Sequence, residues 1–252
     1  MPALKADIIT QLKKDILALQ GSRPLLHQHS QIELGTINHA FPNSQFPLGV
    51  NHEFICHAGG VTGGMTDGMS ENMTASSGFI AGILSSLLQK RGAAIWISAS
   101  QIIFPPALVS FGIEPSQIIF IHLKKQKEIL WTIEEALKCE GLAAVVGEIA
   151  SMDLAVSRRL QLATEQSRVT GFLLRNNPKH AGTTACTCRW RIQPLQSETE
   201  NDLPGVGFAR WKVELLKVRN GRPGKWELEW NNKQFNEVMK HSSSIEEHKH
   251  AV

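Results

Sequence analysis

Residues 53–88 read EFICHAGGVTGGMTDGMSENMTASSGFIAGILSSLL, and the order of residue types in this stretch decides the fold class. Glu53 to Cys56 has the short apolar pattern of a strand, and His57 to Ser77 is a long loop rich in glycine. From Phe79 to Leu88, apolar residues recur with helical spacing, and small residues on the opposite surface permit close packing. The sequence therefore predicts a strand, a glycine loop and a helix in succession.

Strands and helices continue to alternate after this unit. We expect helices from Lys125 to Lys138 and from Asp153, as the N-cap, to Gln166. In chain order, the expected strands are Ala93–Ser98, Ile118–Leu123, Ala143–Ile149 and Val169–Leu174. Strands separated by helices predict βαβ units and a mainly parallel sheet. The run from 143 to 149 is apolar throughout, as in a strand covered on both sides, and we expect it to be central.

Beyond Arg175 the pattern becomes a strict alternation of apolar and polar residues. It recurs at 188–193, 211–215 and 226–230, with Asn220 to Gly224 forming a hairpin connection between the last two. These half-buried strands predict an antiparallel extension of the sheet. The expected fold class is α/β, with a mainly parallel sheet, antiparallel C-terminal strands and helices on both faces.

The two ends of the chain differ in composition from this core, which we place at residues 53–230. Residues 1–21 predict an amphipathic helix that closes at Gly21, and its apolar stripe is Leu4, Ile8, Leu12, Ile16 and Leu19. This stripe packs either on the chain's own core or on a partner protein. Residues 22–52 predict an irregular connection with one small strand near Ile32, and residues 231–252 a polar, disordered tail.

Length and composition exclude several classes of protein. A chain of 252 residues fits one core, and no apolar run approaches the length needed to cross a bilayer. No secretory signal is visible, so we expect a cytoplasmic protein with no membrane contact. The four cysteines are expected to be free thiols.

No metal or catalytic cluster is visible in the sequence. Cys186-x-Cys188 lacks the second ligand pair that zinc needs, and on an alternating strand both sulfurs would face the same side. The histidines from His27 to His57 have no metal-binding spacing and are expected to be exposed to solvent.

Positive charge is concentrated in the second half of the chain. Between Arg158 and Lys225 there are 13 basic and 5 acidic residues, an excess that suits a polyanion but also an ordinary solvated face. A carboxylate on a neighbouring strand, such as Glu214, would make two of these residues, Arg189 and Arg191, structural. The candidate contacts to DNA or a partner are Arg158, Arg159, Lys179, Arg189, Arg191, Arg219, Arg222 and Lys225.

The glycine loop lies where α/β proteins bind nucleotide phosphates through backbone N–H groups and a helix N-terminus. Its candidate residues are His57, Gly59, Gly60, Gly63, Gly64, Gly68, Thr74, Ser76 and Ser77. However, there is no Lys or Arg between Arg23 and Lys90, so the lysine that reaches the terminal phosphates is absent. Asp67 and Glu71 would also repel a triphosphate.

We therefore expect no ATP or magnesium cofactor, no catalytic residues and no ATPase activity. The strand 93–98 is followed by Ala99 and Ser100, which leaves no carboxylate there to activate water. The loop is either a structural relic or protein contact, or it still holds a nucleotide through backbone amides alone.

Four strings identify a family resemblance. They are FIAGILSSLLQKRGAAIWIS (79–98), FPPALVSFGI (104–113), LAVSRRLQLA (154–163) and RWKVELLKVRNGRPGKWELEW (210–230). In this order they resemble the ImuA family, RecA-like accessory proteins of bacterial error-prone translesion synthesis, over residues 50–230. The resemblance implies a RecA-like core of the P-loop NTPase type.

By the same resemblance, the protein would be an SOS-induced helper in DNA-damage repair, and its location would be nucleoid-associated. Its partners would be an ImuB-like Y-family protein and an error-prone DnaE-type polymerase, with RecA and single-stranded DNA as further candidates. Glu148 would lie near the magnesium-coordinating position, and 176–184 would correspond to a DNA-facing loop. Two alternatives remain open: an ATP-binding recombination or repair ATPase, and a SulA-like cell-division inhibitor.

Overall fold

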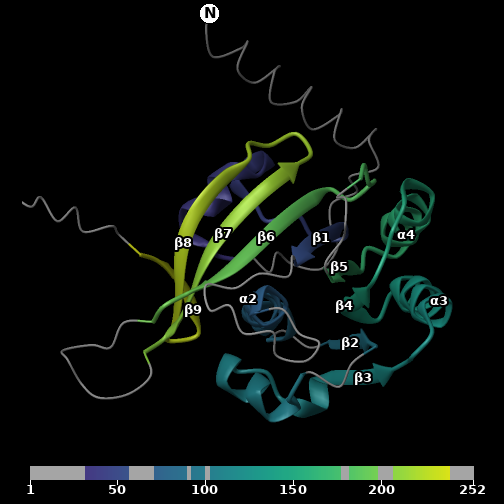
Figure 1. Ribbon diagram of the computed structural model, residues 1–252, viewed down its shortest axis with the longest axis horizontal. Helices are drawn as coiled ribbons and strands as arrows, with labels where there is room; N and C mark the ends of the chain where they lie inside the picture. Colours follow the sequence, from purple (N-terminus) through teal and green to yellow (C-terminus); the bar gives the residue numbers. More distant parts are fainter. Residues whose placement is uncertain are drawn as a thin grey trace, which may run out of the picture.

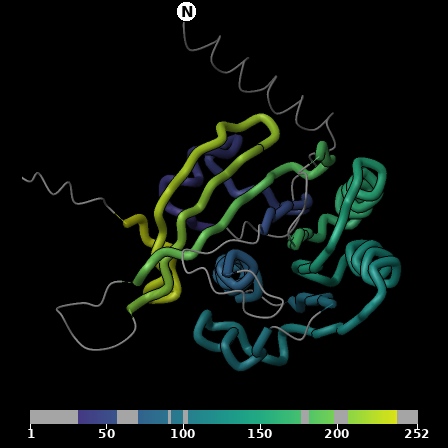
Figure 2. The backbone as a smooth tube through the Cα atoms, in the orientation of Figure 1, coloured from purple at the N-terminus to yellow at the C-terminus, as the bar shows by residue number. Residues whose placement is uncertain are grey.

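The structure is a computed structural model that describes residues 32–56, 71–89, 92–99, 103–176, 182–197 and 207–238. The expected helix at 1–21, the loop residues His57 to Gly68, Lys179 and the end of the tail from 239 lie outside the described residues. The described residues form a nine-stranded sheet in the order β3-β2-β4-β5-β1-β6-β7-β8-β9 (Figures 1 and 2).

One half of this sheet is parallel, as the alternation of strands and helices predicted. Its strands are β1 (Asn51–Cys56), β2 (Ala93–Ser98), β3 (Ile118–His122), β4 (Leu142–Ile149) and β5 (Thr170–Asn176). β4 lies between β2 and β5, but the middle position of the whole sheet belongs to β1, which pairs with β5 and with β6.

The other half is the predicted antiparallel extension. Its strands are β6 (Cys188–Leu195), β7 (Ala209–Val218), β8 (Gly224–Asn231) and β9 (Gln234–Glu237). β7 and β8 pair antiparallel across the expected hairpin. A Cβ atom on Gly221 in this turn would lie 2.3 Å from the Ala40 carbonyl oxygen, so only glycine fits there.

Helices cover both faces of the sheet, which confirms the expected fold class. α2 (Glu71–Leu88) packs on one face, and α3 (Gln126–Leu137) and α4 (Leu154–Ser167) pack on the other (Figure 1). Asp153 caps α4 as predicted, because its carboxylate accepts a hydrogen bond of 2.7 Å from the Val156 amide. Single-turn or short 3-10 helices η1 to η4 span Gly35–Ala40, Pro42–Ser44, Pro105–Phe111 and Pro115–Gln117.

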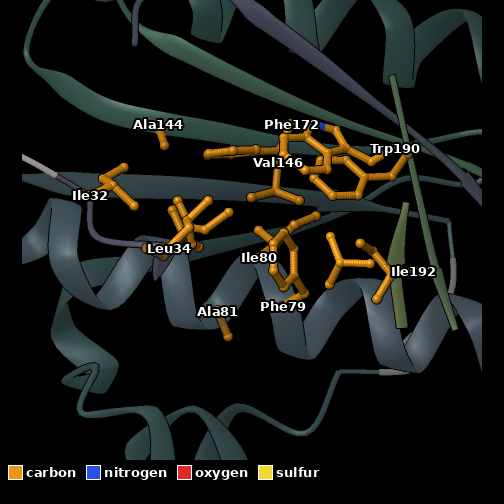
Figure 3. Close-up of a cluster of buried hydrophobic side chains, with 14 of the residues drawn as sticks. Ile32, Leu34, Phe79, Ile80, Ala81, Ala144, Val146, Phe172, Trp190 and Ile192 are labelled. Atoms are coloured by element: carbon orange, nitrogen blue, oxygen red, sulfur yellow. The ribbon is translucent and has the colours of Figure 1, made fainter. Parts of the chain in front are cut away.

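The small residues of α2 permit close packing, as the sequence predicted. A Cβ atom on Gly82 would lie 2.5 Å from the Phe235 ring and 3.0 Å from Trp230. Phe79, which also packs on Phe235 with a ring separation of 5.1 Å, and Ile80 are fully buried beside Trp190 and Ile192 of β6 (Figure 3). This apolar layer fixes α2 against β6.

Three local expectations differ from the structure. The helix begins at Glu71 rather than near Phe79, because Met73, Ala75 and Ser76 already face the core. Residues 32–50 form 3-10 turns rather than a small strand. The polar tail expected from 231 begins with β9, which Phe235 holds by packing on Trp230 with a ring separation of 4.8 Å.

The cysteines are free, as expected, but Cys186 and Cys188 do not face the same side. Cys186 belongs to the core between the sheet and α3 and α4, and Cys188 to the core beneath α2. The reason is that β6 begins only at Cys188, so strand alternation does not apply to Cys186.

Candidate functional site

The first candidate site is the N-terminal end of α2, where a nucleotide's phosphates would sit in a P-loop protein. Thr74, Ser76 and Ser77 lie inside the helix rather than in the loop. The Ser76 hydroxyl donates a 2.7 Å hydrogen bond to the Asn72 carbonyl oxygen, so it is already used within the helix. The remaining residues predicted for this site, His57 to Gly68, lie outside the described residues.

The carboxyl end of β1 lies beside α2 at Ser76. The Cys56 thiol lies 3.4 Å from the Ser76 hydroxyl, and burial raises its pKa to about 11, with the Glu148 charge as a further cause. Glu148 is itself 5% exposed. A neutral thiol beside a buried carboxylate offers nothing that attracts a phosphate.

The first pair of predicted cations is used in helix contacts. Arg159 of α4 forms an ion pair with Glu134 of α3, which links the two helices. The Arg158 guanidinium donates a 2.9 Å hydrogen bond to the Gln161 side chain one turn along α4. Both side chains are exposed, so they remain accessible although each has a partner.

Arg189, another predicted contact residue, belongs to a buried cluster of ion pairs at β1. The Glu53 carboxylate is fully buried and accepts hydrogen bonds from Arg175 at 2.7 Å and from Arg189 at 2.8 Å. The Thr184 hydroxyl donates to the same carboxylate at 2.7 Å. Arg189 is therefore structural, and its guanidinium also holds the Gly182 carbonyl oxygen.

Sequence reasoning missed Glu53 and Arg175 as members of this cluster. The available signal was a charged residue in each of two otherwise apolar strands, EFIC and GFLLR. Charges in buried strands are nearly always paired, so each implied the existence of a partner.

A second carboxylate, Glu214 of β7, gathers three cations. Arg191 and Lys225 each lie 3.0 Å from it, and Lys212 lies 4.0 Å away. Burial alone would raise the pKa of Glu214, but the hydrogen bonds and charges of Lys225 and Arg191 outweigh burial and hold the pKa below its usual value. The expected pairing of Arg191 with Glu214 is thus found, whereas the partner of Arg189 is Glu53.

The β7–β8 hairpin carries the remaining predicted cations, which are exposed. The Arg219 side chain reaches the Ala185 carbonyl oxygen at 3.5 Å, and the Arg222 backbone amide donates to Ala40 at 2.8 Å. Within the described ranges, the Arg222 guanidinium makes no hydrogen bond or ion pair. Of the described candidates, Arg222 is therefore the side chain most available to an anion.

The hairpin adjoins an open face of the sheet. In Figure 1, no described helix lies in front of β6, β7 and β8, and η1 lies behind them. On this face Glu214 lies near three cations, Arg210 pairs with Glu229 at 2.5 Å, and Glu227 lies opposite Lys212 in the strand register. The face is basic, but most of its charges stabilise the strands.

Neither a metal centre nor a membrane span is evident in the part of the chain that the structure describes. No group of three or more His, Cys, Asp or Glu side chains there is arranged to hold a metal ion. None of the described helices is long and apolar enough to cross a bilayer.

Comparison with solved structures supports the fold. A crystal structure of the RadB recombinase, a RecA-like protein, superposes with a TM-score of 0.50 at 15% sequence identity. The match covers 77% of this chain and 93% of RadB. At this identity the likeness shows the fold alone: the described core is RecA-like.

Comparison with curated sequences is more specific. No model of a known protein family matches the chain. Two curated proteins named ImuA match the chain in sequence. One is from Caulobacter vibrioides strain NA1000 / CB15N, and the other is from Caulobacter vibrioides strain ATCC 19089 / CIP 103742 / CB 15. Each is 34% identical over 204 residues, which is 77% of this chain and 80% of the relative. This extent of identity, together with the RecA-like core, shows that the chain belongs to the ImuA family.

Proposed function

We propose that this protein is a non-hydrolysing accessory factor of SOS-induced, error-prone translesion synthesis. In this role it joins an ImuB-like Y-family protein to an error-prone DnaE-type polymerase. Membership of the ImuA family supports the pathway. The bridging role is the function that the family resemblance implies for a RecA-like core that does not hydrolyse ATP.

One observation carries the non-hydrolysing part of the proposal. The chain has no Lys or Arg between Arg23 and Lys90, so the glycine loop and the start of α2 hold no cation to neutralise a triphosphate. Where β1 ends beside α2, the described groups are the Cys56 thiol, the Ser76 hydroxyl 3.4 Å from it and the Glu148 carboxylate, whose charge acts on the thiol. A site of this composition favours a protein contact over a triphosphate.

Co-purification tests the bridge. We expect the DnaE-type polymerase to be retained on immobilised ImuB-like protein only when this chain is added. FtsZ, the division protein that a SulA-like inhibitor would bind, serves as the competing bait. The proposal would be contradicted if the polymerase were retained equally well with and without the chain. It would also be contradicted if the chain bound to FtsZ but not to the ImuB-like protein. In the same preparation, micromolar Mg·ATP affinity or release of inorganic phosphate would favour the recombinase-like ATPase instead.

Single-stranded DNA is a further candidate partner, and the hairpin is the surface on which to test it. We expect weak binding that falls with salt, because the contacts are to phosphates. Replacing Arg222→Gln should reduce the slope of log K against log salt by about 0.7, the value for one phosphate contact on a single strand. Fluorescence anisotropy of a labelled oligonucleotide measures this slope.

The matched control for this variant is Lys138→Gln, which removes an exposed cation at the C-cap of α3 that already pairs with Glu135 at 2.7 Å. This control should leave the salt slope unchanged. If the combined Arg219→Gln, Arg222→Gln and Lys225→Gln variant also binds like the unmodified protein, the basic hairpin has no role in DNA binding.

A further inference from the structure

An open apolar groove lies beside the first turns of α2. It has a volume of 960 Å³, at the upper end of the range for binding sites in proteins. Its walls come from α2, from residues 103–111 around η3, and from the adjoining ends of β6 and β7. We call it the α2 groove.

The rim of the α2 groove exposes large apolar side chains. Phe104 is 68% exposed and Phe208 is 40% exposed, and they stand on different walls of the groove. Trp96 and Trp211 lie deeper and are buried. Exposed aromatic rings that border an apolar hollow are typical of a surface that another segment covers.

The chain itself contains a segment that matches this groove. Residues 4–19 place five apolar side chains, Leu4, Ile8, Leu12, Ile16 and Leu19, at helical spacings of three and four. Such a stripe needs an apolar surface, and docking of an amphipathic helix into a groove is a recurrent mode of recognition. A helix over these residues would be about 24 Å long at 1.5 Å per residue.

The connection is long enough for docking within one molecule. The described chain begins at Ile32, which packs in the same core cluster as α2, and Figure 3 shows Ile32 and Leu34 beside the helix that carries Phe79 to Ala81. The 18 residues of α2 extend over about 27 Å. Residues 20–31, when extended, span about 40 Å, so every point along α2 is within reach.

We propose that residues 4–19 of this chain form a helix whose apolar stripe occupies the α2 groove in the same molecule. Among the described residues, the groove is an open apolar hollow with exposed aromatic rings at its rim, and the stripe offers an apolar helix face within reach of it. Docking would bury Phe104 and Phe208 and would fix the N-terminal segment against the RecA-like core. This inference is independent of the proposed function.

Limited proteolysis of the full chain tests the proposal, because Lys5, Lys13 and Lys14 place trypsin sites within the segment. Docking would protect these sites in proportion to the population of the docked state. We expect Phe104→Glu with Phe208→Glu to accelerate cleavage after Lys13 and Lys14 by about tenfold or more. Leu12→Asp with Ile16→Asp, on the other surface, should have the same effect.

Trp131→Glu is the matched control, because Trp131 on α3 is 62% exposed but does not line the groove. This variant should leave the cleavage rate unchanged, with cleavage after Lys249 in the tail as the internal reference. Equal rates in the groove variant and in the unmodified protein would overturn the proposal. Protection that rises with protein concentration would overturn docking within one molecule in favour of exchange between two copies.

Discussion

Replacing Glu53→Leu is expected to lower the free energy of unfolding by about 3–5 kcal/mol, the cost of removing one partner from a buried ion pair. The leucine would leave Arg175, which is 4% exposed, and Arg189 without their shared carboxylate. It would also free the Thr184 hydroxyl, which holds the segment between β5 and β6 against β1. Urea unfolding followed by tryptophan fluorescence measures the loss.

Two further variants distinguish the effect of the unpaired charge on stability from the effect of lost packing. Glu128→Leu removes an exposed carboxylate that pairs with Lys125 at 3.0 Å, and it should cost less than about 1 kcal/mol. Adding Arg175→Met and Arg189→Met to Glu53→Leu should restore most of the lost stability, since no unpaired charge then remains. If the triple variant is as unstable as the single one, loss of packing rather than uncompensated charge explains the effect.

The Glu53 cluster also shows why part of the site was beyond prediction from sequence. Glu53 and Arg189 are 136 residues apart, and they meet because β6 inserts beside β1 in parallel register. The alternation in the sequence placed Arg189 and Arg191 on one strand face, but it did not identify which strand lies next to that face. The order of the strands in the sheet arises from contacts between residues that are far apart in the sequence, so no local pattern specifies it.

Local patterns sufficed for most of the elements themselves. Ala93–Ser98 is a strand with the predicted bounds, and the Asp153 cap and the alternating strands around Trp190, Trp211 and Trp230 are also found. These signals come from the spacing of apolar residues along the chain, and the same apolar residues are the ones buried in the core. β9 was missed because Phe235 is the single apolar residue within it, and its contact with Trp230 exists only after folding.

His52 shows the same limit for a single side chain. It lies in a segment that is polar in sequence and was expected to be exposed, yet it is fully buried in β1. Its ring stacks on Phe46 at a centroid separation of 4.5 Å. The Trp190 indole N–H donates to Nδ1 at 3.2 Å, and Nε2 lies 2.8 Å from the Pro47 carbonyl oxygen. This arrangement requires a neutral ring with its proton on Nε2.

Acid should therefore destabilise the protein through His52. Burial lowers the pKa of His52 from 6.5 to about 4, against the opposing effect of the Pro47 hydrogen bond. The unfolded chain then binds a proton more readily than the folded chain, so the stabilising contribution is fully present above pH 6.5 and is lost as the pH falls towards 4. A shift of this size corresponds to about 3 kcal/mol over that window.

Urea unfolding at a series of pH values between 7 and 4 measures this loss of stability. Two variants show whether His52 causes the loss. His52→Gln should be less stable at pH 7, because it disrupts the ring stack, but its stability should fall less steeply with acid. His39→Gln, which removes an exposed histidine of η1, should keep the slope of the unmodified protein. The depressed pKa of Glu214 affects stability mainly below that carboxyl group's usual pKa of 4.5, so the interval from 6.5 to 4.5 separates the effect of His52 from that of Glu214. An unchanged slope in His52→Gln over this interval would show that another group takes up the proton.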